Sequence, residues 1–272
     1  MFLPSATTIR KGGFHWRVVH VAREVVYEDT TTNLLGMDDS VKLGLQVGYG
    51  ISERLDVTLQ RSNGRTLQVG TTGKPVNMDY WDMLFKYKLL DQNDGAKDSG
   101  GLADIAVVAG TTYMLRNHTK SKASLDLQVV AERNFFSDRL RLGIGLAYAG
   151  LSTYEAIPGL GSATKLFPDE YDALANPSFD RPENRSAAIP FTCKIALSER
   201  WQLFSEMVVP VAGWRTHDGP ATAAGLRFNT HTHEYSFYFS NTANTAFNGV
   251  VTGGADRWSN LPVFGFNIIG HL

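Results

Sequence analysis

The sequence has very little cysteine and no long apolar run. Its one cysteine, Cys193, excludes an intrachain disulfide. No stretch reaches the roughly 18 consecutive apolar residues of a transmembrane helix. Neither sign of charge is in excess, with 26 basic and 27 acidic side chains, so nothing in the composition points to nucleic acid. The first residues, MFLPSATTIRKGG, also lack the basic start and apolar core of a signal peptide.

The composition is nevertheless unlike that of an ordinary soluble domain. Charged residues make up 19% of the chain and aromatic residues 11%, whereas charged residues reach about 25% in soluble domains. The mean hydropathy of −0.16 looks soluble, but a transmembrane β-barrel alternates lipid-facing with lumen-facing residues and averages to a similar value. Because such a barrel must be exported, we expect the numbering to begin at or near the start of the mature chain.

Strict period-2 alternation over residues 41–61 is the clearest pattern in the sequence. Apolar residues occupy every second position of VKLGLQVGYGI, a short turn SER follows, and alternation resumes in LDVTLQR. This period is that of a β-strand with two unlike faces. Each strand is long enough to cross a bilayer at a tilt.

Similar segments recur along the chain and predict twelve strands. We expect them at about residues 14–26, 41–51, 55–61, 79–89, 102–113, 123–133, 140–148, 188–197, 201–210, 221–229, 233–241 and 261–272. Short and long connections tend to alternate, and Ser-acid-Arg turns recur at Ser52, Ser137 and Ser198. Short turns at one rim and long loops at the other are typical of outer-membrane barrels. We therefore predict one domain over 1–272, an all-β, antiparallel up-and-down transmembrane barrel with short periplasmic turns and longer extracellular loops.

The two faces of the predicted strands differ in a way that favours lipid outside. One face carries bulky aliphatic and aromatic residues; the other carries glycines and charges of both signs, which suit a lumen partly filled by ion pairs. The pore-lining residues predicted by this phase are Lys42, Gln46, Asp56, Lys86, Lys88, Glu132, Arg141 and Glu206. Tryptophans near strand ends fit the headgroup level. A soluble lipocalin-like barrel or a sandwich is the alternative.

Residues 11–90 resemble a family of uncharacterised outer-membrane β-barrels common in Bacteroidota. The matching pieces are KGGF at 11–14, LGMDD at 35–39, VKLGL at 41–45, YGI at 49–51, LDV at 55–57, RS at 61–62 and FKYKLL at 85–90. The resemblance implies a membrane barrel in the outer membrane and supplies no activity. Periplasmic redox or lipid-binding proteins often neighbour the family. The segment 150–187 departs from its pattern.

Few residues carry recognisable chemistry. No histidine is followed two residues later by serine, as in the barrel phospholipase of the outer membrane. His231 and His233 share a strand face, but without a third ligand nearby they are better explained as solvated rim residues than as a metal site. Cys193 is in phase with apolar neighbours and fits the apolar face. We expect no enzyme, no cofactor and no metal.

Two functions remain open. The first is a narrow, porin-like channel for small solutes or ions, which favours anions if Asp56, Glu132 and Glu206 do not neutralise the inner cations. The long segment 150–187 then forms either a constriction or a surface loop. The second is a scaffold that holds partner proteins, including periplasmic or surface redox proteins, through 150–187 or the periplasmic turns. Lipid is the other expected partner, and nucleic acid is not.

Overall fold

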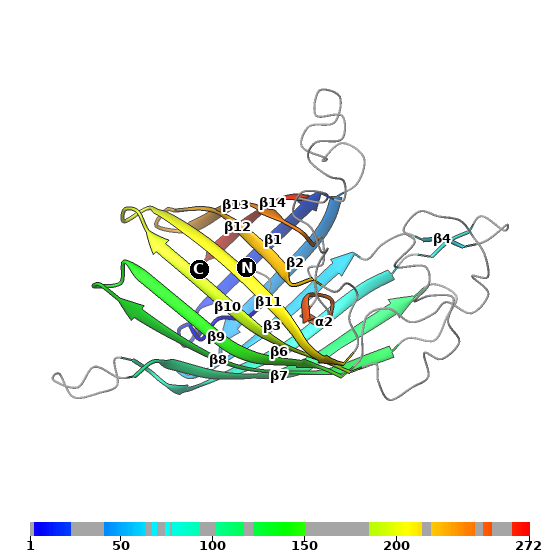
Figure 1. The fold of residues 1–272 in the computed structure, drawn as a ribbon, viewed down its shortest axis with the longest axis horizontal. Helices are drawn as coiled ribbons and strands as arrows, with labels where there is room; N and C mark the ends of the chain where they lie inside the picture. The colour runs from blue at the N-terminus through cyan, green and yellow to red at the C-terminus, as the bar shows by residue number, and fades with distance from the viewer. Residues whose placement is uncertain are drawn as a thin grey trace, which may run out of the picture.

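A closed barrel of twelve antiparallel strands forms the protein (Figure 1). The computed structural model describes residues 3–22, 41–63, 67–69, 74–76, 78–92, 102–116, 122–150, 185–213, 219–242, 247–251 and 263–272. Each strand pairs with its sequence neighbours, and β14 closes the barrel on β1. The predicted strand number and architecture are therefore confirmed.

The observed strands follow the predicted ones to within a few residues. The barrel strands are β1 (Phe14–Ala22), β2 (Val41–Gly50), β3 (Leu55–Asn63), β6 (Met78–Leu90), β7 (Asp104–Arg116), β8 (Lys122–Phe135), β9 (Leu140–Ala149), β10 (Ser186–Ala196), β11 (Trp201–Gly213), β12 (Ala221–Asn229), β13 (His233–Ser240) and β14 (Val263–His271).

Two further elements were not expected. A small hairpin, β4 (Leu67–Val69) with β5 (Lys74–Val76), lies in the connection between the strands predicted at 55–61 and 79–89. A short helix, α2 (Phe247–Val251), lies in the connection between the strands predicted at 233–241 and 261–272. Both elements are too short for a hydrophobic period to be visible in the sequence. Among the described residues, no helix is long and apolar enough to cross a membrane.

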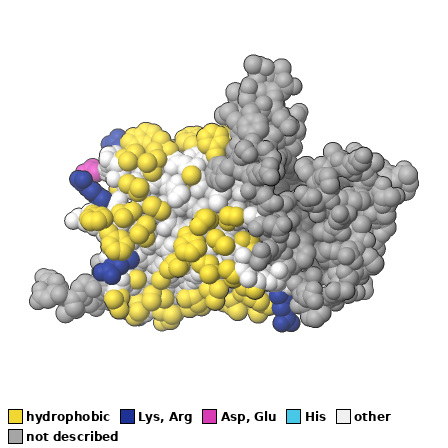
Figure 2. All heavy atoms as spheres, in the orientation of Figure 1, with side chains coloured by type: hydrophobic (Ala, Val, Ile, Leu, Met, Phe, Trp, Pro, Cys, Tyr) yellow, Lys and Arg dark blue, Asp and Glu magenta, His cyan; other side chains and the backbone are white. Residues whose placement is uncertain are grey.

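Bulky apolar side chains cover the outside of the barrel (Figure 2). On β2 the outward residues Leu45, Val47 and Tyr49 are 43–48% exposed, whereas Gly44 and Gly48 on the alternate phase are buried. The same alternation runs through β3, β6 and β8. An apolar outer face of this extent fits hydrocarbon, and full closure leaves no strand edge unpaired in lipid.

Aromatic rings gather near the strand ends. Trp16 packs edge-on against His233 with ring centroids 5.9 Å apart, and Trp201 contacts Phe228 at 4.7 Å. Both pairs lie at the rim of the short turns, whereas Trp81 lies toward the other end of the barrel beneath Arg61. Amphipathic rings at both levels are typical of the interface girdles of membrane barrels.

The recurring Ser-acid-Arg turns are only partly alike. Ser52 Oγ accepts hydrogen bonds from the N–H groups of Arg54 and Leu55, and Ser198 Oγ accepts from Arg200 and Trp201 in the same way. The turn at Ser137 instead holds three consecutive residues, 136–138, at positive φ. The recurring turns therefore share a serine cap at two of the three sites.

Candidate functional site

Residues 3–10 run inside the barrel and occupy the half of the lumen next to the short turns. Residues 3–10 precede β1, and the chain enters β1 at this rim. There Gly12 N donates to Gly50 O (2.8 Å) and Gly50 N donates to Gly13 O (3.0 Å). Followed back from the rim toward the N-terminus, the chain runs into the lumen, where its first described residue, Leu3, is 5% exposed. We call residues 3–10 the lumen segment. In Figure 1 the N-terminal mark falls within the outline of the barrel.

Three lumen carboxylates hold the lumen segment at every third residue. Ile9 N donates to Asp56 Oδ2 (2.9 Å), Ala6 N to Glu132 Oε2 (3.0 Å) and Leu3 N to Glu206 Oε1 (3.1 Å). A period of three is that of polyproline II, which leaves its backbone N–H groups available because it forms no internal hydrogen bonds. The wall therefore supplies the acceptors that the segment lacks.

Wall side chains also reach the other polar groups of the lumen segment. Lys86 Nζ donates to Thr7 O, and Arg141 Nη2 donates to Thr7 Oγ1 at 2.9 Å. Gln128 Nε2 donates to Pro4 O at 3.1 Å. The segment is thus bound from several strands by groups that remain on the wall when the segment is absent.

Glu132 is the centre of the charged network. Its side chain is fully buried, and it accepts from Arg141 at 2.7 Å and from Lys194 at 3.3 Å, in addition to Ala6 N. Arg141 also reaches Asp104 at 3.1 Å. A buried charge of this kind is tolerated only with its partners in place, because breaking one such pair costs about 3–5 kcal/mol.

Three further inward cations are paired as well. Lys86 lies 3.3 Å from Asp56, Lys88 lies 2.8 Å from Asp91, and Arg227 lies 3.0 Å from Glu234. Asp56 and Glu132 therefore neutralise the inner cations that they face, which argues against a strong preference for anions.

Two glycines of β2 make room for the lumen segment. A side-chain carbon on Gly50 would overlap the carbonyl groups of Arg10 and Ile9, and one on Gly48 would lie 2.7 Å from both the His15 and the Ile9 side chains. We predicted that the glycines of this face line the lumen. We did not recognise that they leave room for another segment of the same chain. They are the signal in the sequence that could have revealed it.

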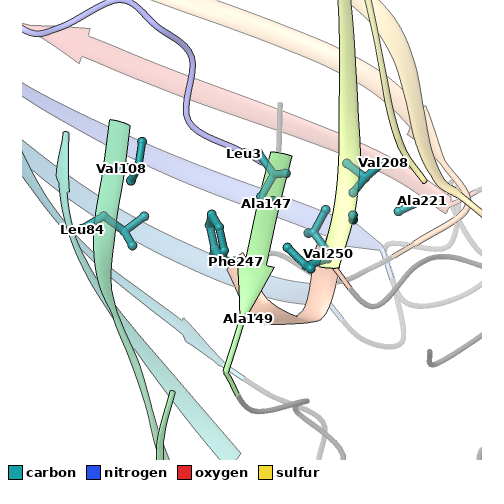
Figure 3. Close-up of a cluster of buried hydrophobic side chains, with 11 residues drawn as sticks. Leu3, Leu84, Val108, Ala147, Ala149, Val208, Ala221, Phe247 and Val250 are labelled. Atoms are coloured by element: carbon teal, nitrogen blue, oxygen red, sulfur yellow. The ribbon is translucent and has the colours of Figure 1, made fainter. Parts of the chain in front are cut away.

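The half of the lumen next to the long loops is filled differently. There α2 packs against β8, β9, β10 and β11, and its apolar residues meet the inner end of the lumen segment (Figure 3). This apolar cluster contains Leu3, Leu84, Val108, Ala147, Ala149, Ala188, Val208, Ala221, Phe247, Val250 and Val251. The two fillers, the lumen segment and α2, therefore meet in the middle of the barrel.

A buried polar group borders this apolar cluster. Thr112 Oγ1 lies 2.6 Å from Asp82 Oδ1 and also bonds Asp126, and Ser124 Oγ donates to Asp126 Oδ1 at 2.6 Å. Phe247 N lies 3.4 Å from Asp82 Oδ2, which links α2 to the wall. Among the described residues, no group of three or more His, Cys, Asp or Glu side chains is placed to hold a metal ion.

Space remains beside the lumen segment. A cavity of about 550 Å³ opens between the segment and the wall formed by β1, β12, β13 and β14, and a smaller one of about 90 Å³ continues it toward Gln60, Asp82 and Phe247. Leu3, Pro4, Arg17 and Lys86 line both cavities. Together they mark an incomplete passage along the segment that ends at α2.

The predicted pore-lining residues can now be placed. Those that the structure describes all point into the lumen: Gln46, Asp56, Lys86, Lys88, Glu132, Arg141 and Glu206. The side chain of Lys42 and nearly all of the segment 150–187 lie outside the described residues. His231 is exposed at a turn and His233 stacks with Tyr235. Sequence reasoning missed the lumen segment, α2, Asp104 and Lys194.

Comparison with solved structures finds outer-membrane barrels at low sequence identity. The COG4313 outer membrane channel from Pseudomonas putida F1 matches with a TM-score of 0.52 and 10% identity over 99% of each chain. Two further structures are more distant. Outer membrane phospholipase A from Escherichia coli has a TM-score of 0.43 and 10% identity over 97% of each chain. A Pseudomonas aeruginosa FadL homologue has a TM-score of 0.43 and 10% identity over 97% of this chain and 91% of the homologue. A comparison with curated protein sequences found no match.

A family model described as "Membrane bound beta barrel domain (DUF5777)" matches residues 1–271. The chain therefore belongs to this family of membrane-bound β-barrels. Family, closed fold and apolar outer face agree, and the protein is an outer-membrane β-barrel. The resemblance drawn from residues 11–90 is confirmed.

Proposed function

We propose that this member of the membrane-bound β-barrel family is a narrow outer-membrane channel for small solutes or ions, which the lumen segment holds closed. The observation that carries the proposal is the path of residues 3–10, which run through the lumen with a cavity of about 550 Å³ at their side. A barrel that served only as an anchor has no need of such a passage.

The attachments of the lumen segment suit a reversible closure. Its backbone is held by individual hydrogen bonds to charged groups, each worth about 1.5–3 kcal/mol, and water can replace these when the segment leaves. Its apolar anchor at the inner end is Leu3. Release also leaves the wall intact, because Glu132 keeps Arg141 and Lys194, and Asp56 keeps Lys86.

Because the charges of the lumen are largely paired, we expect the channel to pass small solutes of either charge without strong selectivity between them. Inner cations and acids on neighbouring or nearby strands pair with each other. A pore whose charges are balanced in this way discriminates mainly by size. α2 contacts β8–β11, and the smaller cavity reaches Phe247 from the side of β2, β3 and β6, so a route past α2 would follow that side.

Single-channel recording in a planar bilayer tests the proposal. We expect the full chain to be closed with rare openings, and a chain lacking residues 1–10, exported behind a cleavable leader, to conduct steadily. Replacing Thr8 by Ala, which removes one peripheral contact to Glu53 O, is the matched control and should stay closed. A truncated barrel that is folded but never conducts would contradict the channel.

A filled lumen also fits the second function, a scaffold that anchors partner proteins. Partners would bind the short turns or the segment 150–187, of which the structure describes only the ends. Gentle extraction followed by mass spectrometry distinguishes the two: a stoichiometric partner combined with a silent truncated barrel supports the scaffold. We propose no enzymatic activity for either function.

A further inference from the structure

The lumen segment is held chiefly through its backbone. Wall side chains bond the backbone N–H or carbonyl group of most of its residues, namely Leu3, Pro4, Ala6, Thr7 and Ile9. Among the described residues, its side chains form hydrogen bonds to the barrel only at the two threonines, with Arg141 and with the carbonyl of Glu53. Every peptide carries the same backbone groups, so most of these wall contacts do not depend on the sequence of the segment.

The side chains of the lumen segment differ in the space around them. Every residue of the segment except Ala6 borders the cavity of about 550 Å³. Ala6 is instead fully buried and packs with Ala106 and Val130 of the wall. Leu3 also belongs to the apolar cluster around α2. Larger side chains therefore fit at most positions, whereas the place of Ala6 accepts only a small residue and that of Leu3 an apolar one.

The space that the lumen segment fills is open at one end. At the rim of the short turns the cavity beside it is lined by His271 and Leu272. At the inner end, Phe247 of α2 shares the apolar cluster with Leu3. A chain bound in the same way must therefore enter from the short turns with its N-terminus first. Eight residues in the polyproline II conformation span about 25 Å, which sets the length of such a chain.

We propose that the lumen is a binding site for short, extended oligopeptides, and that the lumen segment occupies this site as a built-in competitor. The peptide enters by its N-terminus, places an apolar residue at the site of Leu3 and a small residue three positions later. As the substrate class of the channel the inference rests on the proposed function; binding itself does not. Because residues 11–13 tether the segment to β1, a free peptide competes with an effective concentration of roughly millimolar order.

A variant of the full chain provides a vacant site. Ala6→Trp places a large side chain where none fits, so we expect the segment to leave while the wall is unchanged. Ser5→Trp directs the same side chain toward the cavity and is the matched control. A peptide of residues 1–10 with a C-terminal fluorescein would be titrated into both variants in nanodiscs, and into the chain lacking residues 1–10, while anisotropy is recorded.

We expect saturable binding to Ala6→Trp and to the truncated chain, and binding at least about 10-fold weaker to Ser5→Trp, where the tethered segment competes. The truncated chain has a vacant site whether or not the new tryptophan leaves the lumen. Absence of binding to both vacant barrels, or equal binding to all three, would overturn the peptide site.

Changes in the peptide test the class of ligand. Ser5→Gln, Thr8→Asn and Arg10→Gln alter side chains that border the cavity, and a peptide with all three should bind within about 3-fold of the native sequence. Ala6→Leu adds bulk at the closed position and should weaken binding at least about 10-fold. Loss of binding by the first peptide, or unchanged binding by the second, would overturn the class that we assign.

Methylation of single peptide nitrogens tests recognition of the backbone. N-methylation at Ile9 removes the N–H that Asp56 accepts and should weaken binding at least about 10-fold. N-methylation at Thr8, whose N–H bonds no described wall group, is the control and should have little effect. Equal losses at the two positions would contradict recognition through the wall carboxylates.

Conductance of the same preparations separates this inference from the channel. A chain lacking residues 1–10 that binds the peptides but never conducts would overturn the channel and retain the peptide site. A chain that conducts steadily and binds no peptide would overturn the peptide site alone.

Discussion

The two halves of the lumen are closed by different forces. Next to the short turns, charged side chains hold an extended segment through its backbone, with Glu132, Asp56 and Glu206 as acceptors. Next to the long loops, α2 fills the lumen with apolar side chains, and one backbone N–H, that of Phe247, bonds a wall carboxylate. Directional bonds that water can replace suit an element that leaves; packed apolar surface, which water cannot replace, suits one that stays.

The largest loss of stability should follow from removing Glu132, the centre of the charged network in the half of the lumen next to the short turns. Glu132→Ala leaves Arg141 with Asp104 and Thr7 as its described partners and removes the carboxylate that Lys194 pairs with. We expect a loss of about 3–5 kcal/mol in the free energy of unfolding, measured by urea denaturation in lipid vesicles, together with more frequent channel openings. Asp138→Asn, in an exposed turn, is the control and should change neither quantity. An unchanged stability would show that the network contributes little.

A somewhat smaller effect should follow in the apolar half. Phe247 is 2% exposed within the apolar cluster. Phe247→Ala leaves a cavity and should cost about 3 kcal/mol in the same assay. Because the lumen segment stays in place, conductance should not change. A variant that conducts as steadily as the chain lacking residues 1–10 would mean that α2, and not the lumen segment, closes the pore.

A third substitution displaces the lumen segment without touching a charge. Gly50→Val places a side chain where the carbonyl groups of Arg10 and Ile9 now lie, so we expect longer and more frequent openings. In Gly44→Val the added carbon instead meets Val19, at 3.2 Å, which makes it a control on the same strand and face. Equal behaviour of the two variants would argue against a specific role of Gly50.

The smallest effect concerns ion selectivity. Lys86→Glu with Lys88→Glu reverses two inward charges and leaves Asp56 and Asp91 without their cations. In the chain lacking residues 1–10 we expect a shift of the reversal potential toward cations. Lys11→Glu, in the exposed turn before β1, is the control and should leave the reversal potential in place. No shift on reversal of both lumen charges would remove Lys86 and Lys88 from the ion path.

Sequence reasoning succeeded where a repeated period carried the information. Alternation over twelve segments predicted the barrel and the inward phase of Asp56, Glu132 and Arg141. It could not predict which charges meet across the lumen, because a pair such as Glu132 and Lys194, on non-adjacent strands, depends on the stagger of the closed barrel. It also missed residues 3–10, since a short extended segment has no period, and α2, since five residues are too few to show one.

The most direct test of the central claim is to return the lumen segment as a separate molecule. Single channels lacking residues 1–10 would be recorded while a synthetic peptide of residues 1–12 is added on the side of the short turns. The account predicts block that rises with peptide concentration, is absent for a scrambled peptide, and is weakened in Glu132→Gln channels. Steady conductance at all peptide concentrations would contradict closure by the lumen segment.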